Sequence, residues 1–340
     1  MITKRMLMIT LIGALITVLP FSVTAVHAKE AKNPVQIEEW SVPYGGLARD
    51  PFAAGSDKIW FVGQRGNYLG RFTPSTGEFH KRDLSDAPGP HNVIVQSNGV
   101  VWYAGNLAGY IGRYDPVADE VTRIAMPNDA ARDPHTMVFD KDERHIWFTV
   151  QGGNFIGRLT LADHSVRLIP VATSGARPYG IRLAPDGTPW IALLGTNKLA
   201  SVDPETFALT EHELPAKGTR PRRLEITSDG RVWYADYRRG YLGLHDPQSG
   251  RHDEWRLPSG ERSRPYGMAS DKSDRVWLVE TGVMPNLFVG FDTRTEQFFS
   301  VTPIPSGAGS VRHMDYHAPT QSVWFGTDEN TLGRARIGVP

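Results

Sequence analysis

The stretch that decides the fold is WFTVQGGNFIGR, residues 147–158, because versions of it recur along the whole chain. Each copy begins at a tryptophan, and successive copies start 42 to 47 residues apart. Propeller blades repeat every ~40–45 residues, each as four short strands. The spacing therefore predicts an all-β fold, a seven-bladed β-propeller of four-stranded antiparallel blades. The seven tryptophans are Trp60, Trp102, Trp147, Trp190, Trp233, Trp277 and Trp324.

The fourth repeat shows how one blade is written in the sequence. Alternating apolar residues predict four strands there, at 177–183, 190–193, 199–202 and 209–214. Turns rich in Asp, Gly, Pro and Asn separate them, as tight antiparallel connections require. The other repeats follow this scheme, except that the seventh supplies three strands and no fourth.

The missing strand is expected from the other end of the chain. Residues 35–42 precede the first repeat and resemble the fourth-strand sequence at 251–257. An open strand edge invites pairing with other chains, so a ring is expected to hide its last edge. We therefore expect the N-terminal strand to complete the last blade and to close one propeller domain over residues 29–340.

Residues 1–28 have the pattern of a secretory signal peptide. Lys4 and Arg5 precede an apolar stretch at 7–23, and residues 26–28 have the small-x-small pattern of a cleavage site. The apolar stretch is barely long enough to span a bilayer, so an uncleaved anchor is the alternative. We expect a periplasmic or secreted protein with no membrane contact after cleavage.

Composition excludes several classes of partner and site. The chain has 37 basic and 37 acidic residues, and losing Lys4 and Arg5 leaves 35 against 37. This balance argues against nucleic-acid or anionic-membrane partners, which need a basic face. The absence of cysteine excludes thiol catalysis, disulfides and Cys-based metal sites. The expected partner is a small-molecule or peptide ligand at the channel rim, and the expected state is a monomer.

The repeated tryptophans and Gly-Arg pairs have structural explanations. A tryptophan at a fixed place in every blade is expected to pack between adjacent sheets. Glycine is expected to let the third strand approach its neighbour. The sequence has no Gly-x-Ser-x-Gly elbow and no His-Glu-x-x-His pattern, so serine nucleophile catalysis has no support.

The candidate site is predicted at one rim of the central channel. The innermost strand of each blade hairpins into the second, so the start of one lies beside the end of the other. That start falls eleven residues before each tryptophan, or twelve in the third blade, where the turn is longer. Reading round the ring, these positions hold Arg49, His91, His135, Tyr179, Arg222, Tyr266 and His313. We predict that the first five bind substrate.

Two acids stand out at the facing ends of the second strands. Asp236 and Glu280 lie three residues after their tryptophans, on the neighbouring fifth and sixth blades. Carboxylate oxygens suit a hard cation, so a Mg²⁺ site is expected, with Ca²⁺ as the alternative. The two acids could equally neutralise Arg222. A water-filled channel lined with hydrogen-bonding residues and without catalysis is the third interpretation.

Two histidines follow a proline at the rim and are candidate bases. His91 lies in Gly-Pro-His and His135 in Asp-Pro-His. An unperturbed imidazole titrates near pH ~6.5, which suits general base catalysis. Each is also explained as a hydrogen-bonding residue of the channel wall, and the sequence does not choose between the two.

The repeats resemble those of the virginiamycin B lyase (streptogramin B lyase) family. The match is carried by GPHNV at 89–93, DPHTM at 133–137, WFT at 147–149 and GNFIGR at 153–158, and it covers all seven repeats. The resemblance implies a seven-bladed propeller that opens a cyclic depsipeptide ester by elimination, with Mg²⁺ and a histidine base. A base would remove the proton α to a carbonyl, and the cation would stabilise the enolate.

The resemblance also implies which positions carry the reaction. The family's acid at the facing strand end matches Glu280, while the rim base falls at Tyr266. The family's second acid falls at Arg264 and a further histidine at Arg222, so these positions depart from the pattern.

Three functions follow as hypotheses. The first is a Mg²⁺-assisted lyase acting on an ester or lactone. In it Glu280 and Asp236 hold the metal, and Tyr266 or His313 is the base. The second is a non-catalytic extracytoplasmic binding or scaffold propeller. The third is a lactone hydrolase similar to gluconolactonases, against which seven repeats count because six blades are usual there.

Overall fold

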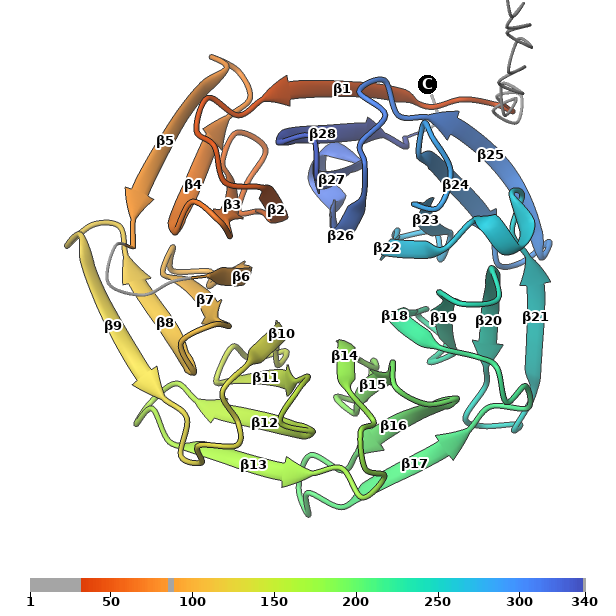
Figure 1. Ribbon diagram of the computed structural model, residues 1–340, viewed down its shortest axis with the longest axis horizontal. Helices are drawn as coiled ribbons and strands as arrows, with labels where there is room; N and C mark the ends of the chain where they lie inside the picture. Colours follow the sequence, from red (N-terminus) through yellow and green to blue (C-terminus); the bar gives the residue numbers. More distant parts are fainter. Residues whose placement is uncertain (1–31, 85–88, 339–340) are drawn as a thin grey trace, which may run out of the picture.

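The computed structural model describes residues 32–84 and 89–338, so the predicted signal peptide lies outside the described residues. Seven four-stranded sheets stand in a ring around a central axis, like blades (Figure 1). Within each blade the strands are antiparallel, and in six blades they follow chain order from the centre outwards. In the seventh blade the outermost strand comes from the start of the described chain. The prediction of a seven-bladed propeller is confirmed.

The first four blades share one pattern, in which a strand of about five or six residues leads into a tight turn. Their strands are β2 (Ala48–Ala53), β3 (Ile59–Gly63), β4 (Tyr68–Thr73) and β5 (Glu78–Asp83); β6 (Pro90–Val95), β7 (Val101–Gly105), β8 (Tyr110–Asp115) and β9 (Glu120–Ala125); β10 (Pro134–Phe139), β11 (His145–Val150), β12 (Phe155–Thr160) and β13 (Val166–Pro170); and β14 (Pro178–Leu183), β15 (Pro189–Leu193), β16 (Lys198–Val202) and β17 (Leu209–Glu213). The four strands predicted for the fourth blade are confirmed to within about a residue.

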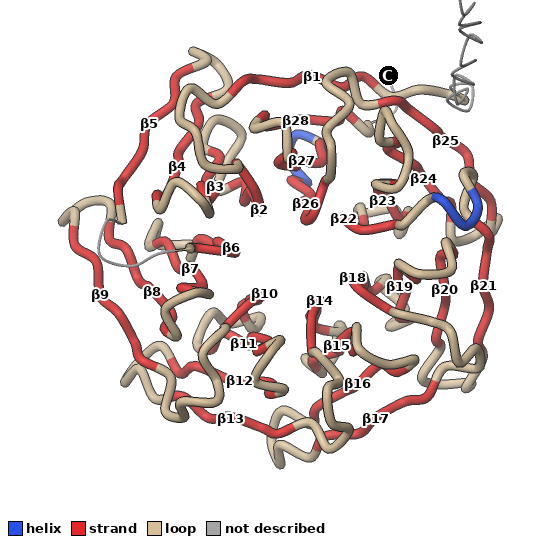
Figure 2. Tube along the Cα trace, in the orientation of Figure 1, coloured by secondary structure: helices blue, strands red, loops and turns tan. Residues whose placement is uncertain are grey.

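The last three blades repeat that order. Their strands are β18 (Pro221–Ile226), β19 (Val232–Asp236), β20 (Tyr241–His245) and β21 (His252–Arg256); β22 (Pro265–Ser270), β23 (Val276–Glu280), β24 (Leu287–Asp292) and β25 (Gln297–Pro303); and β26 (Val311–His317), β27 (Ser322–Thr327) and β28 (Thr331–Arg336) with β1 (Gln36–Ser41). The helices in the described part are two single 3₁₀ turns, Gly260–Arg262 and Ala318–Thr320 (Figure 2). No helix among the described residues is long and apolar enough to cross a membrane.

The seventh blade closes the ring with strands from both ends of the chain. β1 pairs antiparallel with β28 (Figure 1). Glu38 on β1 forms ion pairs with Arg334 and Arg336 on β28. The ring of Trp40 stacks on Trp324, with centroids 5.7 Å apart. The predicted closure by the N-terminal strand is therefore confirmed, and it uses ion pairs as well as backbone hydrogen bonds.

The repeated tryptophans fill the spaces between blades. Trp102 of the second blade packs with Met137 and Phe148 of the third. Trp277 of the sixth blade lies in the same way against Met314 and Phe325 of the seventh. Burial of large apolar side chains between sheets is the main favourable term in folding, which is why the tryptophan recurs once per blade. The expectation that these tryptophans are structural is confirmed.

The third-strand glycines make room for an aromatic ring. Gly157 on β12 lies opposite Phe148 on β11, and a Cβ at Gly157 would lie 2.1 Å from a ring atom of Phe148. Four further glycines sit under a cross-strand ring in this way, namely Gly70, Gly112, Gly243 and Gly333. These glycines accommodate an aromatic ring from the neighbouring strand, a role that the sequence analysis did not predict.

We expect Gly157→Ala to lower the free energy of unfolding by roughly 1–3 kcal/mol, because the added methyl group overpacks the blade against Phe148. Urea unfolding followed by tryptophan fluorescence measures this. Gly55→Ala is the matched control, since a Cβ there meets nothing within 4 Å. Equal stability of the two variants would contradict the steric explanation.

Candidate functional site

Every innermost strand carries a β-bulge near its start. The register with the second strand shifts between Arg49 and Phe52 in the first blade and between Pro221 and Leu224 in the fifth. The other five blades show a register shift at the same place. A bulge leaves a residue unpaired and re-aims its side chain. The residue after Arg49 is Asp50, which has a positive φ of 47°, a conformation that Asp tolerates better than most residues.

The strand registers correct one residue of the predicted rim. Each rim residue follows the strand residue that pairs with the end of the second strand. In the seventh blade that pairing joins Val311 to Thr327, so Arg312 is the rim residue there. The prediction of His313 was wrong by one position, because the 3₁₀ turn Ala318–Thr320 lengthens the hairpin. His313 instead lines a second cavity further along the innermost strands.

The mouth of the channel is a cavity of about 830 Å³. Six of the predicted rim residues line it together with Arg312, so the structure brings them to one place. No carboxylate lies among its lining residues, while the first blade and the fourth to seventh blades each contribute at least one arginine. The lining arginines are Arg49, Arg177, Arg220, Arg222, Arg238, Arg264 and Arg312.

Most of this positive charge is not neutralised by the protein. Asp50 lies 3.0 Å from Arg49, and Asp328 lies 2.6 Å from Arg312. The other five mouth arginines have no carboxylate within ion-pair distance in the described part of the chain. Coulomb repulsion among them is unfavourable, and an anion at the mouth would relieve it.

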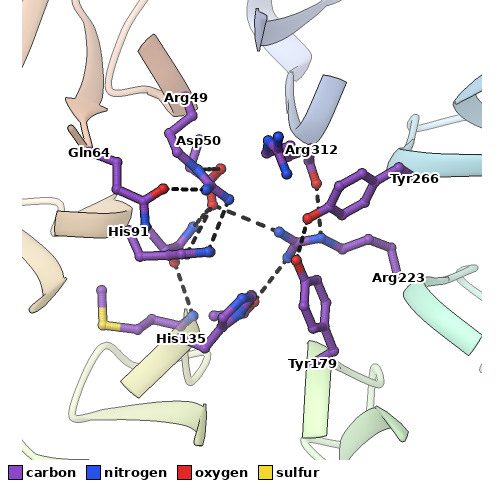
Figure 3. Close-up of polar contacts among 12 residues, drawn as sticks. Arg49, Asp50, Gln64, His91, His135, Tyr179, Arg223, Tyr266 and Arg312 are labelled. Atoms are coloured by element: carbon purple, nitrogen blue, oxygen red, sulfur yellow. Dashed lines mark hydrogen bonds and ion pairs between the residues drawn. The ribbon is translucent and has the colours of Figure 1, made fainter. Parts of the chain in front are cut away.

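A buried network holds the arginines at the centre of the ring. Asp50 is fully buried and contacts the guanidiniums of Arg49 and Arg223 from opposite blades (Figure 3). Arg223 also donates hydrogen bonds to Thr136 Oγ1 at 3.0 Å and to the carbonyl of Arg312 at 3.1 Å. The network crosses the channel and fixes the depth of the mouth. Neither Asp50 nor Arg223 was among the predicted site residues.

Tyr179 and Tyr266 point toward each other across the mouth, with their hydroxyl groups in hydrogen-bonding contact (Figure 3). Arg222 lies between them in sequence and beside them in space. Its Nη2 donates to the Tyr179 hydroxyl at 3.3 Å, and its guanidinium carbon lies 3.5 Å from the Tyr266 ring centroid.

The surroundings shift the pKa values of the two tyrosines in opposite directions. Burial acts to raise the pKa of Tyr179, but the positive charges of Arg222, Arg223 and Arg49 outweigh it and bring that pKa below its ordinary value. Burial and the adjacent Tyr179 raise the pKa of Tyr266 to about 12. Of the two hydroxyl groups, that of Tyr179 therefore loses its proton more readily and that of Tyr266 holds its proton more firmly.

The three channel histidines are held neutral. Burial, and then the charges of nearby arginines, lower the pKa of His91, His135 and His313 well below the ordinary value. The rings of His91 and His135 lie 3.8 Å apart, and His135 lies 4.1 Å from the ring of Tyr179. His91 and His135 therefore line the mouth as neutral rings in contact with each other.

We expect the free energy of unfolding to fall as the pH drops below ~6.5, because the unfolded chain then takes up protons that these buried imidazoles refuse. A depressed folded-state pKa gives stability that is complete above pH ~6.5 and lost on acidification. Each histidine contributes up to ~1.4 kcal/mol per pH unit. Urea unfolding at pH 7, 6 and 5 measures the slope, which His135→Phe should reduce; an equal slope in the variant would contradict this.

The two predicted metal ligands are bonded to backbone and serine groups and are not among the residues that line the mouth. One oxygen of Asp236 accepts the backbone N–H groups of Arg220, Arg238 and Arg239 at 3.0 to 3.2 Å. Both oxygens of Glu280 accept hydrogen bonds from Ser259, one from its amide and one from its hydroxyl. Neither carboxylate lines the mouth cavity.

The donor groups at the mouth do not fit a divalent cation. Among residues 32–84 and 89–338, no group of three or more histidine, aspartate or glutamate side chains is placed to hold a metal ion. The mouth carries guanidiniums where a Mg²⁺ site needs oxygen ligands. The arrangement suits an anion and offers no support to the expected Mg²⁺ or Ca²⁺ site.

The missed residues leave only a faint signal in the sequence. Side chains alternate between the two faces of a regular strand. Asp50 and Arg223 each follow a rim residue, so alternation predicts that they face away from the channel. The bulge cancels this rule and lets consecutive residues reach the centre. The one available sign was two successive polar residues at the start of a buried strand, as in Arg49-Asp50 and Arg222-Arg223.

Known proteins share this architecture. The virginiamycin B lyase from Staphylococcus aureus superposes with a TM-score of 0.79 at 20% identity, over 89% of this chain and 99% of that one. A streptogramin B lyase gives 0.79 at 22% identity, over 90% and 99%. Kuenenia stuttgartiensis hydrazine synthase gives 0.73 at 12% identity, over 88% and 98%. At these identities the likeness concerns the fold alone.

Sequence comparison with family models gives the stronger assignment. A search of curated proteins finds no match. The model that describes the virginiamycin B lyase family matches residues 28–202 and again 164–338. These two overlapping matches take in all seven blades and the closing strand, so the chain belongs to the virginiamycin B lyase family.

Proposed function

We propose that this propeller recognises a ligand carrying several carboxylate groups at its channel mouth, in the periplasm or outside the cell. The observation that carries the proposal is the mouth cavity itself, which is lined by seven arginines and no carboxylate. Guanidiniums bind carboxylates through paired, charge-assisted hydrogen bonds, and a recessed site strengthens them by excluding water.

Arg222 is the residue on which recognition is expected to depend most. Its guanidinium carbon lies 3.5 Å from the ring centroid of Tyr266 and 5.0 Å from that of Tyr179. The residue is half-buried, and its Nε has no hydrogen-bond partner among the described residues. A buried guanidinium with an unused donor is ready to bind an acceptor from a ligand. The cavity volume of about 830 Å³ accommodates an oligomer of a few acidic units.

Calorimetric titration with oligogalacturonate tests the proposal. We expect saturable binding that weakens as salt is added, since salt screens charges in the open mouth. The methyl ester of the same oligomer, which has no charge, should not bind. Arg222→Ala should lower the affinity at least ~30-fold, equivalent to ~2 kcal/mol for loss of a partly desolvated charge contact.

Arg294→Ala is the matched control, because Arg294 lies on the β24–β25 turn, is mostly exposed and does not line the mouth. It should bind like the wild type. Equal binding of the charged oligomer and its ester, or equal affinity in both arginine variants, would show that the mouth is not an anion site.

A metal-assisted lyase, as the family name implies, is the second candidate. Its support is the family membership and the position of Glu280 at the end of β23. Titration with MgCl₂ distinguishes the two, using wild type and Glu280→Gln. Mg²⁺ binding that disappears in the variant would favour the lyase with metal. Anion binding without any Mg²⁺ requirement favours recognition by arginine.

A further inference from the structure

The tyrosine pair is the feature of the mouth that anion binding alone does not explain. Tyr179 and Tyr266 come from the fourth and sixth blades, and their hydroxyls meet inside the arginine-lined cavity. Binding of a carboxylate by arginine does not require two tyrosine hydroxyls in contact. Two phenol groups in contact, each buried and each lining the ligand cavity, are placed to move a proton.

The surrounding charges divide the two tyrosines into a base and an acid. Arg222 donates to the Tyr179 hydroxyl, and Arg223 lies 5.2 Å from the centre of its ring. These guanidiniums stabilise a phenolate at Tyr179, while the higher pKa of Tyr266 keeps its proton available. A pair of titratable groups whose pKa values are pushed apart is the arrangement found in acid–base catalysis.

A carboxylate held by arginine supplies the matching substrate chemistry. Neutralising the carboxylate makes the hydrogen on the adjacent carbon more acidic, because the developing enolate then carries less net charge. An alkoxy group on the next carbon can leave as that proton is removed. Among common oligomers with repeated carboxylates, uronate sugars have this β-alkoxy arrangement, whereas acidic peptides lack the leaving group.

We propose that Tyr179 and Tyr266 catalyse a β-elimination on a uronate oligosaccharide, with Tyr179 as the base and Tyr266 as the acid. The proposal rests on the proposed function, since the substrate must first bind in the mouth. The Tyr179 phenolate takes the hydrogen α to the carboxylate, and the electrons of that C–H bond form a C=C bond. The bond between the β-carbon and the alkoxy oxygen breaks, and Tyr266 gives its proton to that oxygen.

The hydroxyl contact also returns the pair to its starting state. After one turnover Tyr179 is protonated and Tyr266 is a phenolate, and one proton crossing between their touching oxygens reverses this. No metal, oxidant or other co-reactant is needed. Because base and acid oxygens lie side by side, the hydrogen and the alkoxy group must leave from the same face of the sugar.

The same-face requirement makes a sharp choice of probe substrates. In oligomannuronate the α-hydrogen and the leaving oxygen lie on one face of the ring, whereas in oligogalacturonate they lie on opposite faces. We expect the protein to bind both and to cleave only oligomannuronate. Ultraviolet absorbance of the unsaturated carboxylate product measures the rate, with calorimetry giving the affinity for each oligomer separately.

Two conservative variants test the roles. Tyr179→Phe and Tyr266→Phe should each lower kcat on oligomannuronate by ~10²-fold or more, while the affinity stays within ~3-fold. Tyr110→Phe is the control, because it removes a buried hydroxyl from β8, outside the mouth, and should keep the wild-type rate. Chelation of divalent ions should leave the rate unchanged.

The outcomes separate this proposal from the proposed function. Binding of both oligomers without any product would overturn the elimination and leave anion recognition standing. Cleavage that survives Tyr179→Phe, requires a divalent ion, or prefers oligogalacturonate would also overturn it. Failure of both oligomers to bind would overturn the two proposals together.

Discussion

Replacing Asp50 by alanine is expected to lower the free energy of unfolding by roughly 3–5 kcal/mol. Asp50 is fully buried at the centre of the ring and contacts the guanidiniums of Arg49 and Arg223. Its removal leaves both arginines, which are themselves buried, facing each other without an anion. Urea unfolding of the variant against wild type measures the loss.

Two further variants identify the cause of that loss. Asp50→Asn keeps the side-chain shape and tolerates the positive φ of this position, so its effect isolates the charge. Asp57→Ala is the control, because Asp57 is exposed and, among the described residues, bonds to Ser75 alone. It should cost less than ~1 kcal/mol. If Asp50→Ala were as stable as Asp57→Ala, the network would not be what holds the channel centre together.

Deleting β1 is expected to make the protein aggregate. Without residues 32–41 the outer edge of β28 has no partner, and its backbone N–H and C=O groups are open to pairing with other chains. The stacking of Trp40 on Trp324 and the ion pairs of Glu38 are lost as well. Size-exclusion chromatography and circular dichroism should show aggregates and reduced strand content.

A synthetic peptide of residues 32–43 provides the decisive control for the deletion. Added in excess during refolding, it should pair with β28 and recover part of the monomer, since ligand binding to the folded state stabilises it by mass action. A peptide with Trp40 changed to alanine should recover much less. A deletion variant that remained monomeric without any peptide would mean that the six remaining blades and the open seventh are stable unaided.

The architecture was predictable because it depends on residues that recur at regular spacing. Tryptophans at a constant spacing, Asp-Gly and Asp-Pro turns, and a surplus strand at 35–42 each repeat or complete a pattern. Such patterns record which residues face a core, and this depends on strand alternation and turn chemistry that operate locally. Ring closure was predictable because the seventh repeat lacks a fourth strand and the segment at 35–42 supplies one that no other repeat needs.

The site was harder to predict because it depends on departures from the period. One extra residue in the hairpin of the seventh blade replaced His313 by Arg312 at the rim. The bulges brought Asp50 and Arg223 to the centre, although alternation turns them outwards. Glu280 does lie at the strand end, but its oxygens are bonded to Ser259, which strand position alone does not reveal.

Charge gave a second lesson. The chain has 37 basic and 37 acidic residues, and this balance argued against partners that need a basic face. The fold nevertheless gathers seven arginines at one end of the channel without any lining carboxylate. A total charge carries no information on its distribution, and only the three-dimensional register of the blades collects the arginines in one place.

The seventh blade also constrains how the chain can be made. Gln36 and Arg336 pair although they lie 300 residues apart, so the last blade stays incomplete until β28 has been synthesised. Contacts this distant in sequence form late, because the loop between them must first be ordered. Until then β1 is an unpaired strand that can pair with other chains. The negative charges of Glu38 and Glu39 within it disfavour such pairing. The closing strand is thus also the segment most exposed to misassembly during synthesis.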